Sequence, residues 1–260
     1  MNTFALTLRD SATMLRRDIQ HSLRNPTMTV SGLMTPIIMM LLFVYIFGGA
    51  IGAGLGALVQ GGSYINYVAP AIIMMTVGSG CATTAINLCM DLSEGIITRF
   101  RTMAIARAAV LTGQVLGSVI RTLITCMLIV VVSLLIGFRP TASPLAWLMA
   151  LGLVTMFAIG ITWMGVLFGL IGKTPAGANS LSLIFQLLLP FTSSAFVSPD
   201  SMPAGVRWFA QYQPYTPVIE TLRGLLLGTP IGNSAILAVA WCIVLALVGY
   251  FSARALYNRL

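Results

Sequence analysis

The residues best suited to chemistry lie in a mixed-charge segment, residues 91–107, between two long apolar stretches. Its apolar residues recur at helical spacing, with carboxylates near its start and arginines towards its end. A short helix with an apolar ridge flanked by charges is suited to docking in a groove of another protein. The alternative is a solvated loop whose arginines only fix the orientation of the chain. The docking candidates are Asp91, Glu94, Arg99, Phe100, Arg101 and Arg107.

The sequence offers little for catalysis or metal binding. His21 is the only histidine, so a histidine-based triad or a histidine-rich metal site has no second member. The tripeptide Gly172-Lys173-Thr174 lacks the upstream glycine and the preceding strand of a phosphate-binding loop. We therefore predict no catalytic residue, no metal site and no cofactor in this chain. All four cysteines lie in apolar stretches and are interpreted as small buried residues: Cys81, Cys89, Cys126 and Cys242.

The composition excludes a soluble protein. The chain has 260 residues, of which 58% are hydrophobic and 8% charged, and its mean hydropathy is +0.95. A soluble domain has about 25% charged residues, which help to cover its surface. These values exclude a soluble enzyme, a secreted disulfide scaffold and a disordered tail. They predict an all-α polytopic membrane protein.

Six stretches of the chain are each long enough and apolar enough for one transmembrane helix. The first two are expected near residues 30–47 and 67–88, separated by the glycine-rich segment 48–56. A third helix is expected at about 106–136. The other three are expected within the uncharged runs 140–172, 174–199 and 224–253. We therefore predict six transmembrane helices.

The basic residues indicate the orientation of the chain. With the N-terminus inside, ten Lys and Arg residues fall in inner segments and three in outer ones, Arg139, Arg207 and Arg223. This arrangement places both termini in the cytoplasm and explains the net charge of +8. Nucleic acid is not an expected partner, because no basic stripe is interleaved with aromatic residues. No carboxylate falls deep in a predicted span, which disfavours a proton-coupled carrier. If the chain is a conduit for a solute, we expect a partner to supply the energy.

Two segments outside the spans are expected to form helices at the membrane surfaces. Residues 1–26 carry an apolar stripe with arginines off it, which predicts an amphipathic helix on the inner leaflet, in contact with membrane lipids. This helix is either a topology anchor or a docking element. Residues 198–228 predict two short helices, the second at about 218–227, with Glu220 and Arg223 spaced to pair. They form either a re-entrant outer hairpin or an interfacial cap.

Polar residues inside the predicted spans either line a cavity or form hydrogen bonds between helices. These candidates are Thr83, Asn87, Thr162 and Gln186. Because few charged groups are available, we expect a hydrophobic or amphiphilic cargo. The spacing of small residues that allows two helices to approach closely occurs at Gly48, Gly52 and Gly56, at Gly113 and Gly117, and at Gly165 and Gly169.

Four motifs in their order along the chain resemble those of the ABC type-2 exporter permeases, especially the daunorubicin-resistance type. They are Arg16-Arg17-Asp18 with Arg24-Asn25-Pro26, the run 41–49, residues 91–107 and residues 214–228. The resemblance covers nearly the whole chain and implies a single permease domain over residues 1–260. One departure is that such families often carry a proline near Ala104.

The resemblance also implies partners and a mechanism. The permease is expected to form a dimer, here a homodimer, joined to two copies of a separate ATPase subunit that binds ATP and Mg²⁺. Residues 91–107 are then a cytoplasmic coupling helix that contacts the ATPase. We expect a permease in the bacterial plasma membrane that exports a drug-like compound or a lipid. The alternatives are a membrane scaffold without transport activity and an intramembrane enzyme acting on lipid, which the missing catalytic residues disfavour.

Overall fold

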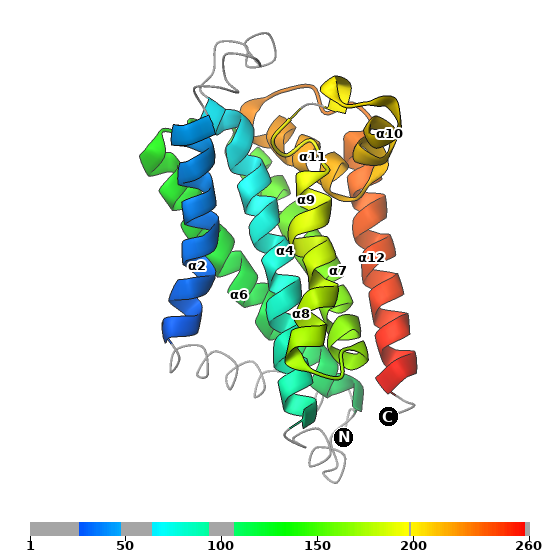
Figure 1. The fold of residues 1–260 in the computed structure, drawn as a ribbon. Coiled ribbons are helices and arrows are strands. Elements are labelled where there is room, and N and C mark those ends of the chain that lie inside the picture. The colour runs from blue at the N-terminus through cyan, green and yellow to red at the C-terminus, as the bar shows by residue number, and fades with distance from the viewer. Residues whose placement is uncertain (1–25, 48–63, 94–106, 198, 258–260) are drawn as a thin grey trace.

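The structure, a computed structural model, describes residues 26–47, 64–93, 107–197 and 199–257 (Figure 1). Within these ranges every regular element is a helix and no β-strand occurs, which confirms the all-α fold. The longer elements are α2 (Pro26–Leu41), α4 (Tyr64–Ser93), α6 (Arg107–Ile136), α7 (Pro144–Ile171) and α12 (Ser234–Tyr257). The shorter ones are η1 (Leu42–Phe47), α8 (Pro175–Leu183), η2 (Ile184–Leu188), α9 (Leu189–Phe191), η3 (Pro199–Ser201), α10 (Ala204–Tyr212) and α11 (Tyr215–Leu227).

Among the described residues, four helices are long and apolar enough to cross a membrane: α4, α6 from Leu111, α7 and α12. They correspond to the predicted second, third, fourth and sixth spans. The predicted first and fifth spans correspond to shorter apolar helices, Met34–Ile46 and Pro175–Phe191. These two segments also contain the π-helical stretches η1 and η2, which the sequence analysis did not predict. The structure therefore confirms several apolar helices, four of which are long enough to cross a membrane.

Local sequence signals explain several helix boundaries. Before α7, the Ser143 hydroxyl accepts a hydrogen bond from the N–H of Ala146 at 3.3 Å. Before α8, the Thr174 hydroxyl accepts one from the N–H of Gly177 at 3.1 Å. Both helices have proline in their first turn, where a missing N–H costs nothing. At its other end, α11 stops at Gly228, whose φ of 72° is unfavourable for other residues.

One helix begins earlier than expected. The sequence predicts a helix from about residue 218 after a break at residues 213–217, whereas α11 begins at Tyr215. Pro217 therefore lies in the first turn of α11 rather than ahead of it. A proline in the first turn removes an N–H that has no helical acceptor, so the helix tolerates it there.

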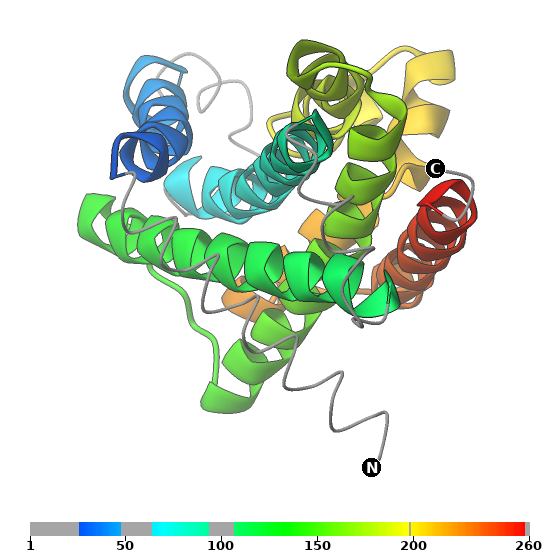
Figure 2. The same ribbon diagram turned by 90° about the horizontal axis from the view of Figure 1, so that it is seen from below.

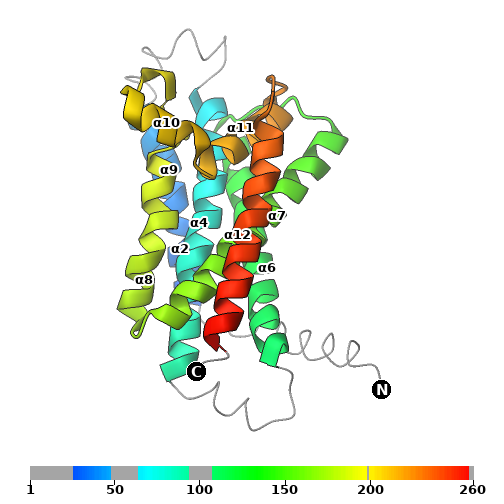
Figure 3. The ribbon, with the colours of Figure 1, turned by 90° about the vertical axis from the view of Figure 1, so that its right-hand side faces the viewer.

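The helices form a bundle with α4 and α7 at its centre. Helix α4 contacts α2, α6, α7, α8, η2 and α11, while α12 packs along α7. Figure 2 shows α6 lying along one side of the bundle at an angle to the other long helices. The starts of α2 and α6 and the ends of α4 and α12 all lie at the lower end in Figure 1. Helices α10 and α11 lie across the upper end (Figure 3).

The central helices pack closely because small residues face each other. A Cβ atom at Gly165 of α7 would lie 2.6 Å from the Cys81 carbonyl oxygen of α4, and one at Gly169 would lie 2.8 Å from that of Ala85. The close approach predicted from this glycine pair is confirmed. All four cysteines are buried, as predicted, and none forms a disulfide. By contrast, α12 exposes a row of large apolar side chains, as expected for a helix that faces lipid.

Candidate functional site

A buried arginine anchors the helices at the upper end of the bundle. Arg223 of α11 is 6% exposed, and its Nη1 lies 2.7 Å from Oε1 of Glu220, one helical turn earlier. The pairing predicted from the spacing of these residues is therefore present. Glu220 is more exposed than Arg223, so one partner of the pair reaches towards the surface while the other is enclosed.

The guanidinium group of Arg223 also contacts two other parts of the chain. Its Nη2 donates to the carbonyl oxygens of Tyr67 in α4, at 3.0 Å, and of Ser194 after α9, at 3.3 Å. The guanidinium carbon lies 3.8 Å from the centre of the Tyr67 ring, which is the geometry of a cation–π contact. In turn, the Tyr67 hydroxyl donates to the Ser194 carbonyl oxygen at 3.1 Å. One cation therefore joins α11, α4 and the segment that follows α9.

Further hydrogen bonds fix the same region. The N–H of Ser194 donates to the hydroxyl of Thr216 at 3.1 Å. The side-chain amide of Gln213 donates to the Leu189 carbonyl oxygen at 2.8 Å. Tyr67, Ser194, Thr216, Glu220 and Arg223 together are called the outer junction below. Ser194, Thr216 and Arg223 are buried, so an unmade hydrogen bond at any of them would be costly.

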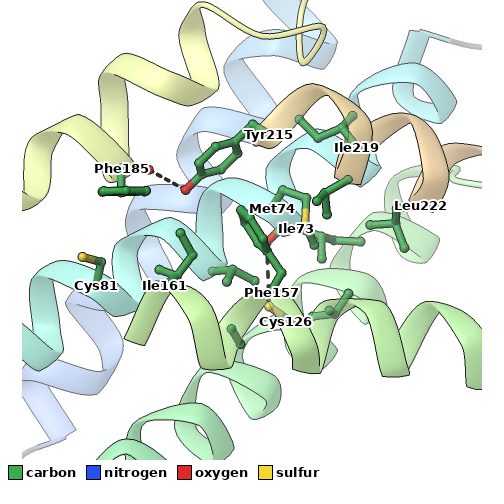
Figure 4. Close-up of a cluster of buried hydrophobic side chains, with 14 of the residues drawn as sticks. Ile73, Met74, Cys81, Cys126, Phe157, Ile161, Phe185, Tyr215, Ile219 and Leu222 are labelled. Carbon is green, nitrogen blue, oxygen red and sulfur yellow. Dashed lines mark hydrogen bonds between the residues drawn. The ribbon is translucent and has the colours of Figure 1, made fainter. Parts of the chain in front are cut away.

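A second contact of α11 lies deeper in the bundle. The hydroxyl of Tyr215 donates to the carbonyl oxygen of Phe185 in η2 at 2.5 Å (Figure 4). The Tyr215 ring is completely buried and meets the Phe157 ring edge-on, with 5.1 Å between the ring centres. Helix α11 is thus attached both to η2, through Tyr215, and to the segment after α9, through Thr216 and Arg223.

The four polar candidates for a cavity lie in different environments. Thr162 of α7 is 1% exposed, so it does not face an open cavity in this structure. Thr83 of α4 is exposed, and its hydroxyl donates to the Ser79 carbonyl oxygen of its own helix at 3.2 Å. Asn87 in α4 and Gln186 in η2 are half-buried. Their role in a transport path therefore stays a prediction.

The predicted coupling segment is described only at its two ends. Asp91 is half-buried in the last turn of α4, and Arg107 is the first residue of α6. Glu94, Arg99, Phe100 and Arg101 lie outside the described residues, as do most of residues 1–26. The last turn of α4 and the first turn of α6 both lie at the end of the bundle opposite α11 (Figure 1). Among the described residues, no three His, Cys, Asp or Glu side chains gather as they would around a metal ion.

Comparison with known proteins adds an independent finding. The family model described as "ABC-2 type transporter" matches residues 10–227. The chain is 29% identical to the daunorubicin resistance ABC transporter permease protein of Streptomyces coeruleorubidus, over 78% of this chain and 70% of that protein. It is 25% identical to the probable doxorubicin resistance ABC transporter permease protein of Mycobacterium tuberculosis, over 82% of this chain and 79% of that protein. It is 24% identical to an inner membrane transport permease of Escherichia coli, over 76% of this chain and 77% of that protein.

Proposed function

Because the chain belongs to the ABC-2 type transporter family, we propose that it is the permease subunit of an ATP-driven exporter in the bacterial plasma membrane. The family match over residues 10–227 carries this proposal. The apolar bundle supports it, since such a bundle offers a path across the membrane. The chain moves its cargo outward and takes its energy from a separate ATPase subunit.

The bundle crosses the membrane six times in this proposal. The crossings are α2 with η1, α4, α6, α7, α8 with η2 and α9, and α12. An even number of crossings agrees with the start of α2 and the end of α12 lying at the same end of the bundle (Figure 1). The excess of basic residues in the segments at that end supports a cytoplasmic location for both termini. Residues 198–228 then form the re-entrant hairpin of the outer side, and residues 1–26 lie along the inner leaflet in contact with membrane lipids.

Residues 91–107 dock on the ATPase and receive its motion. Two ATPase copies bind ATP and Mg²⁺ and draw together, and this movement displaces the docked segment. The segment is continuous with α4, a helix of 30 residues and about 45 Å. At its outer end, α4 supplies the Tyr67 ring and carbonyl oxygen that hold Arg223. One continuous helix, with Pro70 inside it, therefore leads from the docking segment to the outer junction, so closure of the ATPase biases the bundle between two packings.

The cargo is hydrophobic or amphiphilic, a drug-like compound or a lipid. Two relatives are named for resistance to daunorubicin or doxorubicin, which are the first compounds to test. A second copy of this chain completes the path in a homodimer, with Thr83, Asn87, Thr162 and Gln186 as candidate lining residues. The exposed apolar side chains of α2, η1 and the α8–α9 segment provide area for that contact.

Purification tests the proposal. The chain is expressed in its native host, extracted in a mild detergent, and the proteins that stay bound are identified and quantified. We expect one ATPase subunit for each permease. A chain that retains no ATPase, in a preparation where the bundle remains folded, contradicts the proposal and favours a scaffold without transport activity.

A further inference from the structure

The fifth apolar segment changes its hydrogen-bond pattern just before a proline. Residues Ile184–Leu188 form the π-helical stretch η2, in which the N–H of Leu189 donates to the Ile184 carbonyl oxygen. If this i→i+5 pattern continued, the Phe185 carbonyl oxygen would receive the N–H of residue 190. Residue 190 is proline, which has no N–H. The pattern therefore leaves the Phe185 carbonyl without its next helical donor.

A side chain from the outer helix supplies the missing donor. The Tyr215 hydroxyl donates to this carbonyl oxygen at 2.5 Å, inside a completely buried environment (Figure 4). Tyr215 is the first residue of α11, so the bond joins the start of that helix to the middle of the fifth segment. A buried carbonyl oxygen without a hydrogen-bond donor destabilises the fold, so the hydrogen bond from Tyr215 to Phe185 is stabilising.

Space for this contact depends on a glycine of α4. A Cβ atom added at Gly78 would lie 2.6 Å from the Phe185 carbonyl oxygen and would also contact the Tyr215 hydroxyl. Three segments, α4, η2 and α11, therefore meet at one point, and the point is open only because residue 78 has no side chain. Gly78, Phe185, Pro190 and Tyr215 are together called the tyrosine latch.

We propose that Tyr215 is a positioning residue for transport: it holds α11 closed against the fifth apolar segment by bonding to the carbonyl that Pro190 leaves open. The inference rests on the proposed function. The bond is reversible because water that enters an opened path can replace the Tyr215 hydroxyl at the Phe185 carbonyl. The Glu220–Arg223 ion pair lies within α11, whereas the bonds from Arg223 to the Tyr67 and Ser194 carbonyl oxygens join α11 to other segments, as the latch does. In this proposal the latch separates when the path opens.

The test is a double-mutant cycle read by the reactivity of Cys81. This residue is completely buried and lies one helical turn from Gly78 on the same side of α4. The other three cysteines are replaced by alanine, and the full chain is labelled with N-ethylmaleimide in proteoliposomes, alone and with its ATPase. The variants are Tyr215→Phe, Pro190→Ala and the double variant. Tyr212→Phe, which removes a hydroxyl from an exposed tyrosine of α10, is the matched control.

We expect Tyr215→Phe to raise the labelling rate of Cys81 about fivefold, the effect of losing one buried hydrogen bond. Pro190→Ala supplies an N–H for the Phe185 carbonyl and so releases Tyr215, which also raises the rate. In the Pro190→Ala background, Tyr215→Phe then adds less than about twofold, because the two substitutions remove the same bond. Tyr212→Phe leaves the rate unchanged.

Three results overturn the latch. The first is an unchanged Cys81 rate in Tyr215→Phe, and the second is the same effect of Tyr215→Phe in both backgrounds. The third is an equal rise in the labelling rate of Cys126 in a matched single-cysteine chain, which indicates that the whole bundle has become more open.

A further measurement tests the opening step. With the ATPase bound, we expect MgATP to raise the labelling rate of Cys81 in the chain that keeps Tyr215 and Pro190, and an unchanged rate contradicts the opening step. If no ATPase binds, the proposed function fails, while the cycle on the chain alone still tests the latch.

Discussion

Arg223 of α11 and Tyr67 of α4, 156 positions apart in the sequence, contact each other both through a ring face and through a hydrogen bond to the backbone. The Arg223 side chain is buried, and its guanidinium group has acceptors on three segments, which are α11 itself, α4 and the segment after α9. A planar fork with several N–H groups can satisfy three acceptors at once, which a lysine ammonium cannot do in the same geometry. The outer junction therefore depends on arginine itself and not only on a positive charge.

The first prediction concerns the guanidinium group of Arg223. Arg223→Lys keeps the charge but loses at least one of the three acceptors, so the free energy of unfolding falls by about 1–3 kcal/mol. The free energy of unfolding of each variant is measured in mixed detergent micelles. Arg139→Lys replaces an exposed arginine on the same side of the bundle, and we expect a change of less than about 0.5 kcal/mol. Equal effects at the two positions would show that the junction has no special stabilising role.

The second prediction concerns the contact between α4 and α7. Gly165→Ala places a Cβ 2.6 Å from the Cys81 carbonyl oxygen, so the helices must separate, and we expect a loss of about 2 kcal/mol or more. Gly152→Ala lies in the same helix with no atom within 4 Å of its Cβ. It should be neutral or stabilising by up to about 1 kcal/mol, since alanine favours a helix. The midpoints of thermal unfolding in detergent compare the two variants, and the reverse order would exclude close packing at Gly165.

The third prediction concerns the coupling segment. Glu94→Ala and Arg101→Ala remove charges from the proposed ATPase contact, so ATP hydrolysis continues while export of daunorubicin falls by about tenfold. Because the substitutions lie outside the long apolar runs of the sequence, we expect unfolding midpoints to stay within about 2 °C. Lys173→Ala, at the other inner connection, is the control and should leave export unchanged. Unchanged export in well-expressed Glu94→Ala and Arg101→Ala chains removes these residues from the coupling role.

Much of the fold follows from patterns that are local in the sequence. Long uncharged runs predict the apolar helices, because a helix is the simplest way to satisfy backbone groups inside a membrane. Ser143 and Thr174, each followed by proline, are local signals for the starts of α7 and α8, although the sequence analysis did not use them. The pairing of Glu220 with Arg223 follows from helical spacing alone. Each of these features depends on residues that lie within one or two turns of each other.

The contacts that hold the outer helices could not be predicted in this way. Tyr67 and Ser194 meet Arg223 only after three segments have folded together, and no spacing rule links their positions. The Tyr215 contact depends on the π-helical pattern of η2 and on the missing N–H of Pro190, and the apolar run 174–199 contains no signal for that pattern. The earlier start of α11 could not be predicted either. A proline such as Pro217 indicates a helix break in most positions, and it is compatible with a helix only in the first turn, whose position the sequence does not give.

The most direct test of the account is transport by purified components. The chain is reconstituted in proteoliposomes with and without its ATPase, and ATP-driven movement of daunorubicin against its gradient is measured. We predict accumulation only when the chain, the ATPase and MgATP are all present. Uphill transport by the chain without any ATPase, or ATP hydrolysis by the intact complex that moves neither daunorubicin nor a labelled lipid, would contradict it.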